Sequence, residues 1–211
     1  MPRIQPLPTA DLADAHVGSL DDDARQRPQA VRPVPRGAYR TFGRLAAFAG
    51  RAHVVACLRS NGAVRAALEE RPGDGRVLVV KVCDADAARR CAFLGDNLTA
   101  LLVASGWAGA VVAGGVRDAA AMRGMAGLGV VALGACPLKS ARAPDPAGRC
   151  ADEAAAGVDL SGGATAAPSG AAAAAADWAV VRTGDFLYVD EDGFIISDRE
   201  LSLGGSGTQS S

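Results

Sequence analysis

Apolar residues along this chain gather into short, uninterrupted runs, separated by polar turns and by stretches with helical spacing. The run from Val77 to Val82 has the length and β-branched content of a fully buried strand, and Phe48 to Cys57 is also predicted to be a strand. The longest apolar stretch, from about Leu98 to Val116, is broken by glycines and by Ser105, so it predicts a helix and a buried strand and no membrane span. Strands that alternate with helices predict an α/β fold with a mixed sheet that has a parallel portion.

Capping residues and turn signals place the other elements. Thr9 is predicted to cap a helix from about Ala10 to His16, and Ser60 to cap a helix that runs to about Glu70. The proline-rich stretch that ends near Gly43 is predicted to be a loop. Further helices are predicted after Gly95-Asp96-Asn97 and from Asp118 to about Met125, and further strands at Ala110–Ala113, Val130–Leu133, Trp178–Val181, Phe186–Val189 and Phe194–Ser197, with a turn at Asp192-Gly193.

Length and composition predict one packed domain. The chain has 211 residues, of which 49% are hydrophobic, and this is enough for one sizeable core. Residues from about 143 to 177 are mostly Ala, Gly, Pro and Asp, and they lack the large apolar side chains that offset the entropy of ordering. We therefore expect a single domain over residues 1–200, with a mobile surface insertion at about 143–177 that holds at most one helical stretch, and a disordered tail at 201–211.

Charge and cysteine usage exclude several classes of protein. A formal net charge of −1 argues against a surface that binds nucleic acid directly. The five cysteines form no CxxC pair, which predicts reduced and mostly buried thiols in an intracellular protein. Because the N-terminus has no apolar signal region, we expect a cytoplasmic protein without a membrane partner.

The candidate chemistry lies in two short groups of residues. Gly95-Asp96-Asn97-Leu98 and Arg117-Asp118 each stand where a predicted strand gives way to a helix, with twenty residues between Asp96 and Arg117. Unpaired amides in the first turn of a helix favour anions, and an arginine fork matches the geometry of a carboxylate. The two groups together predict a site for a small oxyanion, with Asp118 facing a divalent metal ion.

The same residues carry a resemblance to a known family. The segments FLGDNLTALLVASGWAGAVVAGGVRD, LGVVALGACPLKS and GDFLYVDEDGFII resemble the regulator of ribonuclease activity A (RraA) family and its relatives, the class II 4-hydroxy-4-methyl-2-oxoglutarate/4-carboxy-4-hydroxy-2-oxoadipate aldolases. The resemblance covers roughly residues 9–140 and 177–197. The aldolases share a pattern of Asp, twenty residues, Arg-Asp, two residues, and then Glu or Asp. Asp96, Arg117 and Asp118 fit that pattern, whereas the last position is Ala121.

The resemblance implies a fold, an assembly and a reaction. The fold is a swivelling β/β/α domain, and the assembly is a homotrimer or a hexamer with the active site at a subunit interface. The reaction is retro-aldol cleavage or oxaloacetate decarboxylation of a small 2-oxo acid, which yields pyruvate and depends on Mg²⁺ or Mn²⁺. By the resemblance, the amides of Gly95 to Leu98 and the Arg117 side chain hold the substrate, Asp96 helps to transfer a proton, and Asp118 holds the metal.

The sequence also allows alternatives to a metal-dependent lyase to be considered. A family regulator would instead bind and inhibit a ribonuclease E-type RNA-degrading enzyme, and the loss of the third acid at Ala121 favours that role. A Schiff-base aldolase would need Lys81 or Lys139, both of which are better explained as charges at the ends of elements. The chain has no GxGxxG motif for a nicotinamide cofactor, and its two histidines have no zinc-ligand spacing. Asp84 and Asp86 are interpreted as solvated loop acids.

Overall fold

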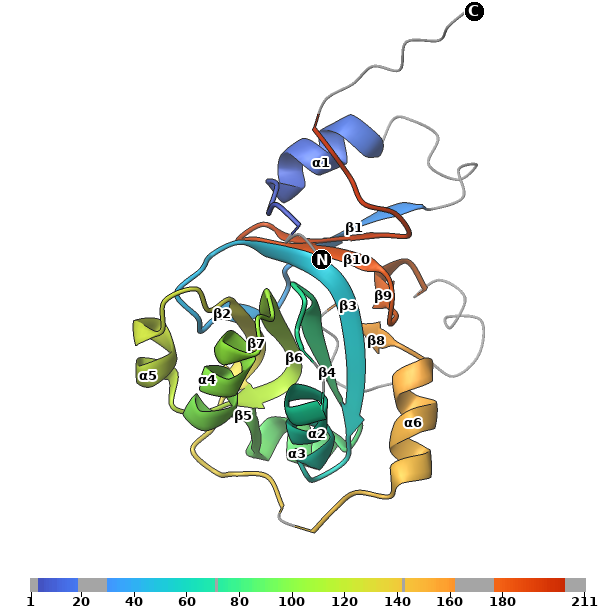
Figure 1. Cartoon of the computed structure of the whole chain (residues 1–211). Coiled ribbons are helices and arrows are strands. Elements are labelled where there is room, and N and C mark those ends of the chain that lie inside the picture. Colours follow the sequence, from blue (N-terminus) through green and yellow to red (C-terminus); the bar gives the residue numbers. More distant parts are fainter. Residues whose placement is uncertain (1–3, 19–29, 71, 142, 162–176, 204–211) are drawn as a thin grey trace, which may run out of the picture.

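Most strands of the protein join one large mixed sheet. The structure is a computed structural model, and it describes residues 4–18, 30–70, 72–141, 143–161 and 177–203. Within these residues a nine-stranded sheet has the strand order β1-β11-β10-β3-β4-β6-β7-β2, with β5 paired to β6 off this path. A second, two-stranded sheet consists of β8 (Val158–Asp159) and β9 (Val180–Val181). Figure 1 shows the large sheet curving through the molecule, with helices beside it.

One half of the large sheet is parallel, as the alternation of strands and helices predicts. Its strands are β3 (Phe48–Cys57), β4 (Val77–Val82), β6 (Gly109–Val116) and β7 (Val130–Ala135), and β5 (Ala92–Leu94) runs parallel to β6. The connecting helices are α2 (Gly62–Glu70), α3 (Ala85–Arg90), α4 (Asp96–Ala104) and α5 (Ala119–Gly124). Parallel strands end at one edge of the sheet, so the residues that follow them are brought close together.

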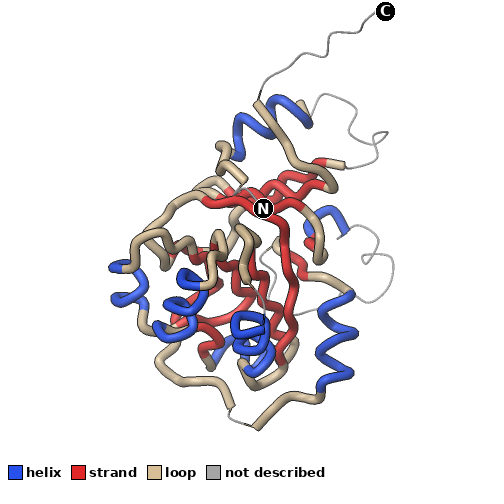
Figure 2. Tube along the Cα trace, in the orientation of Figure 1, coloured by secondary structure: helices blue, strands red, loops and turns tan. Residues whose placement is uncertain are grey.

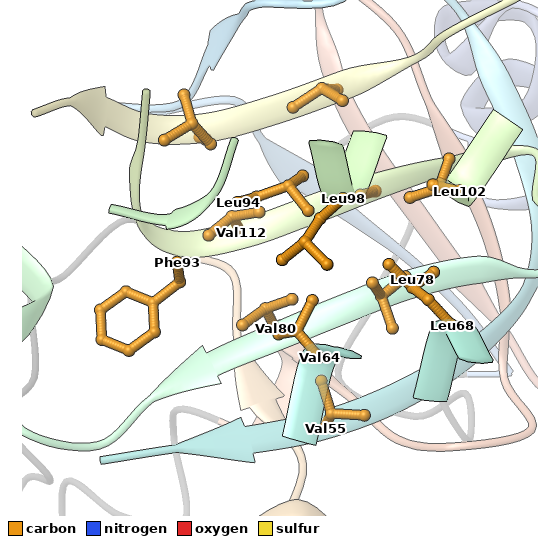
Figure 3. Packing of buried hydrophobic residues seen from close by; sticks show 14 of the residues in the cluster. Val55, Val64, Leu68, Leu78, Val80, Phe93, Leu94, Leu98, Leu102 and Val112 are labelled. Carbon is orange, nitrogen blue, oxygen red and sulfur yellow. The ribbon is translucent and has the colours of Figure 1, made fainter. Parts of the chain in front are cut away.

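The main core lies between this parallel half and its helices. Leu98 and Leu102 of α4 are almost fully buried. They belong to the same apolar cluster as Val64 and Leu68 of α2 and the β4 side chain Leu78. Figure 3 shows these side chains filling the space between the ribbons. Burial of such branched side chains is the main force that fixes α4, and therefore its N-terminus, against the sheet.

The other half of the sheet is antiparallel, and it contains a strand that we did not predict. β10 (Phe186–Val189) and β11 (Gly193–Ser197) form a hairpin beside β3, and β1 (Val31–Pro35) pairs with β11. The prediction of a continuous loop up to about Gly43 is therefore wrong, because β1 and the short β2 (Arg40–Thr41) lie within it. Two of the five residues of β1 are proline, which is tolerated because β1 is an edge strand.

The first helix begins one residue earlier than predicted and is capped differently. Helix α1 spans Thr9–His16, and its N-cap is Pro8, which makes no side-chain cap hydrogen bond. Thr9 is not the cap. Its amide and hydroxyl group donate instead to the Asp190 carboxylate, each at 2.7 Å. Asp190 therefore supplies from the C-terminal hairpin the acceptor that the start of the helix needs.

Two further helices differ from expectation or refine it. Helix α3 is unpredicted, and Asp84 is its N-cap, accepting from the amides of Asp86 and Ala87 at 3.0 and 2.9 Å. The hydrogen bond from Ala87 and the contact with Arg59 lower the pKa of Asp84, so it is an engaged cap and no free loop acid. Helix α6 (Ala147–Ala155) is the helical stretch expected in the insertion, and Figure 2 shows it apart from α2 to α5, beside β3.

Some sequence predictions fall partly or wholly outside these elements. Only Val180–Val181 of the predicted strand from Trp178 is extended, because Asp177–Ala179 forms a 3-10 turn. The predictions for 162–176 and 204–211 lie outside the described residues. The five cysteines are free thiols, and burial raises the pKa of Cys57 to about 12, which makes it unreactive.

In the part of the chain that the structure describes, no helix is long and apolar enough to cross a bilayer.

Candidate functional site

The two predicted groups of site residues meet at the carboxyl edge of the parallel strands. Gly95 follows β5 and Arg117 follows β6, and these strands are neighbours with Leu94 paired to Val116. The Arg117 amide donates to the Leu94 carbonyl at 3.0 Å, which extends the pairing up to the site. The twenty residues between Asp96 and Arg117 form α4, a turn and β6. They bring the chain back to the edge of the sheet at which β5 ends.

Gly95 allows the start of α4 to lie close to the side chains of Arg117 and Asp118. A Cβ atom at this position would lie 2.9 Å from Oδ2 of Asp118 and 3.0 Å from Nε of Arg117. Cβ atoms are essentially never found closer than 3.0 Å to such atoms, so any side chain here would displace the pair. The backbone of Gly95 is extended, with φ −133°, so its role is close approach and not an unusual conformation.

Arg117 and Asp118 form an ion pair that is open to solvent. Nε of Arg117 lies 3.2 Å from Oδ2 of Asp118, and the side chains are 36% and 37% exposed. The same oxygen accepts from the amide of Asp96 at 3.4 Å. Two of the donors that the sequence assigns to a ligand carboxylate, the Asp96 amide and Nε of Arg117, thus converge on Oδ2 of Asp118.

Asp118 has an unusual backbone conformation. Its φ of +60° and ψ of 35° fall in the left-handed region, which residues other than glycine rarely adopt. Asp118 holds the N-cap position of α5, yet its side chain makes no cap hydrogen bond to that helix. The carboxylate is directed across to α4 instead, and strain of this kind is typical of functional sites.

The remaining predicted residues contribute differently. Oδ1 of Asp96 accepts from the amide of Asn97 at 2.7 Å, which fixes the Asp96 side chain at the start of α4. Asn97 is exposed, whereas the Leu98 side chain is buried in the core, so only its backbone can serve a ligand. The contacts described here join Gly95, Asp96, Arg117 and Asp118. No hydrogen bond joins Asn97 or Leu98 to Arg117-Asp118 within the described ranges.

Thr99 is a site-shaping residue that sequence reasoning missed. It is fully buried, and its hydroxyl group donates to the Asp96 carbonyl at 2.8 Å. The same oxygen lies 3.4 Å from the sulfur of Met125, just beyond α5, so Thr99 ties the two helices of the site together. The sequence could have indicated this role, because Thr99 is a polar residue among the apolar residues that follow the first turn of α4.

The lysines do not join this site. Nζ of Lys81 lies 2.8 Å from Oε2 of Glu153 and also donates to the Glu153 carbonyl, so its ammonium group is already paired. Lys139 is an exposed residue beyond β7. A Schiff-base mechanism needs an amine in a desolvated pocket. Lys81 is instead engaged with Glu153, and Lys139 lies at the surface.

Fold and site together define a partly parallel α/β protein with polar residues at the carboxyl edge of its sheet. The chain belongs to the RraA-like family, because the Aldolase/RraA family matches residues 9–196. Its fold is the mixed α/β fold of RraA structures. It can be superimposed on the RNA-processing inhibitor RraA from Thermus thermophilis with a TM-score of 0.67, at 28% identity, covering 98% of this chain and 99% of that one.

Curated relatives are similar over most of their length. A protein of Laribacter hongkongensis is 39% identical over 89% of this chain and 99% of its own. One of Cupriavidus necator is 37% identical over 92% of this chain and 96% of its own. Both carry the provisional name 4-hydroxy-4-methyl-2-oxoglutarate aldolase. These likenesses agree with the resemblance that the sequence motifs indicated.

Proposed function

We propose that the chain is a divalent-metal-dependent lyase of small 2-oxo acids. The reaction is retro-aldol cleavage of substrates of the 4-hydroxy-4-methyl-2-oxoglutarate type, oxaloacetate decarboxylation, or both, and each yields pyruvate by way of its enolate. The observation that carries the proposal is that Nε of Arg117 and the first amide of α4, that of Asp96, both approach the Asp118 carboxylate at the carboxyl edge of the sheet. The name given to the similar curated proteins supports the same substrate class.

Arg117 supplies the main donors for a substrate carboxylate. Of its guanidinium nitrogens, only Nε has a partner among the described residues, so the two terminal nitrogens remain for a ligand. A carboxylate bound there would also lie near the positive end of α4, where negative charge is stabilised. The 2-oxo acid would then be held by its carboxylate beside Asp118.

The acidic residues fit a metal ion that keeps part of its water shell. Within the described residues, no group of three His, Cys, Asp or Glu side chains could hold a metal ion by itself. Mg²⁺ is commonly bound through one or two carboxylates, with water and substrate oxygens completing its coordination, and Mn²⁺ favours the same oxygen ligands. The half-exposed carboxylate of Asp118 would hold such an ion, directly or through water. When bound, the ion would polarise the 2-oxo group and stabilise the enolate.

Proton transfer is the contribution that we assign to Asp96. In retro-aldol cleavage the C3–C4 bond breaks, the 4-hydroxyl group loses its proton, and the enolate carbon gains one. The Asn97 amide occupies Oδ1 of Asp96, and Oδ2 has no partner among the described residues. Asp96 can therefore accept the hydroxyl proton, directly or through one water, and return it to the enolate.

Oxaloacetate decarboxylation by the purified protein tests the proposal. Pyruvate formation is measured with Mg²⁺, with EDTA, and in the variants Arg117→Ala and Asp118→Ala. We expect EDTA to abolish activity and each variant to lose about a hundredfold or more, as removal of one charge-stabilising group typically does. Arg123→Ala is the matched control, since Arg123 is exposed on α5. Activity no greater than that of the free metal would refute the catalytic proposal.

Inhibition of an RNA-degrading enzyme is the second candidate function. It is favoured by the likeness to the Thermus RNA-processing inhibitor and by Ala121, an exposed residue of α5 where the aldolase pattern has an acid. A protein that lacks lyase activity but slows RNA cleavage by a purified ribonuclease E-type enzyme would establish this role. Slowed cleavage by Arg117→Ala as well would show that the inhibitory surface is separate from the pocket.

We further propose that the chain assembles as a homotrimer or a hexamer. The proposal follows from the resemblance, in which the active site lies between subunits. Sedimentation equilibrium distinguishes the two assemblies and would exclude both if the protein were monomeric. A monomer would also count against lyase activity.

A further inference from the structure

Backbone amides at the carboxyl end of β3 bind the carboxylate of Asp145. Oδ2 of Asp145 accepts from the Leu58 amide at 2.7 Å, and Oδ1 accepts from the Arg59 amide at 3.0 Å. The amide of Ser60 lies within 3.2 Å of both oxygens. Three consecutive N–H groups therefore converge on one anion. We call the amides of Leu58, Arg59 and Ser60 the amide nest.

The amide nest is suited to a small oxyanion. Successive backbone N–H groups that point to one centre form a concave site with positive partial charge, as in many phosphate sites. It lies at the edge of the parallel strands where α/β proteins bind their ligands. Ser60 is only 3% exposed, so its amide needs a partner from the protein or from a ligand.

The carboxylate that occupies the nest comes from a separate part of the chain. Asp145 is 87 residues from Leu58 in sequence, and it belongs to the connection between β7 and α6. Prolines precede and follow it, which restricts the backbone around Asp145. The nest itself is formed by three consecutive residues directly after β3. The nest and the carboxylate that occupies it thus come from separate segments of the chain.

Hydrogen bonds connect the nest to β5, and through it to the candidate site. The Arg59 carbonyl accepts from the amide of Ala141 at 2.7 Å, and the neighbouring amide of Ser140 donates to Ala92 of β5 at 3.1 Å. The Asn61 side chain donates to the Phe93 carbonyl at 3.3 Å. β5 ends one residue before Gly95. These hydrogen bonds place the nest beside the strand that precedes the start of α4.

We propose that the amide nest is an oxyanion subsite for a carboxylate or phosphate group, and that Asp145 occupies it in the ligand-free protein. The ligand displaces Asp145 and takes over its hydrogen bonds to the three amides. Since Asp145 competes from within the same chain, the parent protein binds such an anion more weakly than a variant that lacks this carboxylate. This proposal does not depend on the lyase reaction.

Titration of the backbone amides tests the subsite directly. The ¹H–¹⁵N resonances of Leu58, Arg59 and Ser60 are followed in the parent protein and in Asp145→Ala, with acetate in one series and inorganic phosphate in another. Ionic strength is held constant with chloride. We expect the three resonances to shift and saturate in both proteins, with affinity on the order of tenfold tighter in the variant. The anion that binds more tightly identifies the ligand group.

Two further variants keep the outcome decisive. Asp152→Ala removes an exposed acid of α6 that makes no contact with the nest, so it should bind as the parent does. Asp145→Asn keeps an oxygen acceptor and serves if Asp145→Ala does not fold. The proposal is overturned if neither anion shifts the three resonances in the Asp145 variants, or if the parent protein does not respond at all. Equal affinity in the parent and Asp145→Ala would also overturn the competition by Asp145.

Discussion

Each half of the large sheet has an aspartate that accepts from the backbone, but the two aspartates differ in the number and length of their contacts. In the antiparallel half, Asp190 accepts from the Thr9 amide and hydroxyl group at 2.7 Å, from the Asp192 amide at 2.9 Å and from the Gly193 amide at 3.3 Å. In the parallel half, Asp118 has one contact of 3.2 Å and one of 3.4 Å.

This difference separates a structural carboxylate from one that is available to a ligand. Asp190 has most of its acceptor capacity filled, and it joins α1 to the C-terminal hairpin. Asp118 has longer contacts, a strained backbone and an exposed side chain, so it can exchange its partners at little cost. We therefore expect changes at the Asp118 site to alter activity, and changes at Asp190 to alter stability.

Among changes that leave the charged residues of the site in place, the largest effect on activity is expected for Gly95→Ala. The new methyl group would push Asp118 and Arg117 away from α4, because its Cβ would lie 2.9 Å from Oδ2 and 3.0 Å from Nε. Both atoms belong to flexible side chains, so they can move aside by a few tenths of an ångström. A shift of that size is smaller than the ~1 Å misplacement that costs about a hundredfold, so we predict a loss of about tenfold in pyruvate formation. Stability should change little, since the displaced groups are exposed.

Gly124→Ala is the matched control for that substitution. A Cβ atom at Gly124, the last residue of α5, would have no neighbour within 4 Å. We expect unchanged activity and an unchanged or slightly higher melting temperature, since alanine favours helix. Equal loss of activity in both variants, or a Gly95→Ala enzyme as active as the parent, would contradict the role given to Gly95.

The opposite pattern is expected for Asp190→Ala. Removing this carboxylate leaves the start of α1 and the turn of the hairpin without their acceptor, and we predict a loss of about 1–3 kcal/mol in the free energy of unfolding. Urea denaturation measures the loss, and catalytic activity should be retained. The control is Asp198→Ala, which removes an exposed acid whose ion pair with Arg199 is 3.8 Å long. If Asp190→Ala lost activity with unchanged stability, the structural role given to Asp190 would be wrong.

The pH dependence of stability tests the same carboxylate. Burial alone would raise the pKa of Asp190, but hydrogen bonds from Thr9, Asp192 and Gly193 outweigh burial and hold it below the ordinary value of 3.8. A carboxylate whose pKa is lowered by folding stabilises the folded protein at pH values above its ordinary pKa. That stabilisation is lost as the pH falls through the lowered pKa. The stability difference between the parent and Asp190→Asn should therefore be constant near neutral pH and shrink below about pH 4. A difference that grows in acid would contradict the lowered pKa.

The parallel half was predictable from sequence because each strand is a local apolar run. Val77–Val82 was predicted at the bounds that the structure has, and β3 likewise. The sequence also predicted that the groups at Gly95 and Arg117 form one site, and the pairing of β5 with β6 places both at the same edge. What the sequence could not show is the left-handed backbone of Asp118, since it follows from how β6 meets α5 in three dimensions.

Elements that depend on distant partners were missed. β1 contains two prolines, and it is a strand only because β11 lies beside it as an acceptor and donor. The start of α1 depends on Asp190, 181 residues away, so no local capping pattern reveals it. Asp145 likewise has its partners at Leu58 to Ser60. These cases share one cause, which is that the hydrogen-bonding partner lies far away in the sequence.

The smallest expected effect is a gain, and it concerns the third acid of the aldolase pattern. Ala121 is the third residue of α5 and is exposed, so Ala121→Glu should not disturb packing. A carboxylate in the first turn of a helix is stabilising by about 0.3–1 kcal/mol, and it would lie on the same short helix that follows Asp118. We predict a severalfold lower Mg²⁺ concentration at half-maximal activity, measured by titrating the metal. Ala120→Glu, which points about 100° away around the helix, is the matched control. An identical response in both variants would show that added negative charge, and not its position, changes the metal dependence.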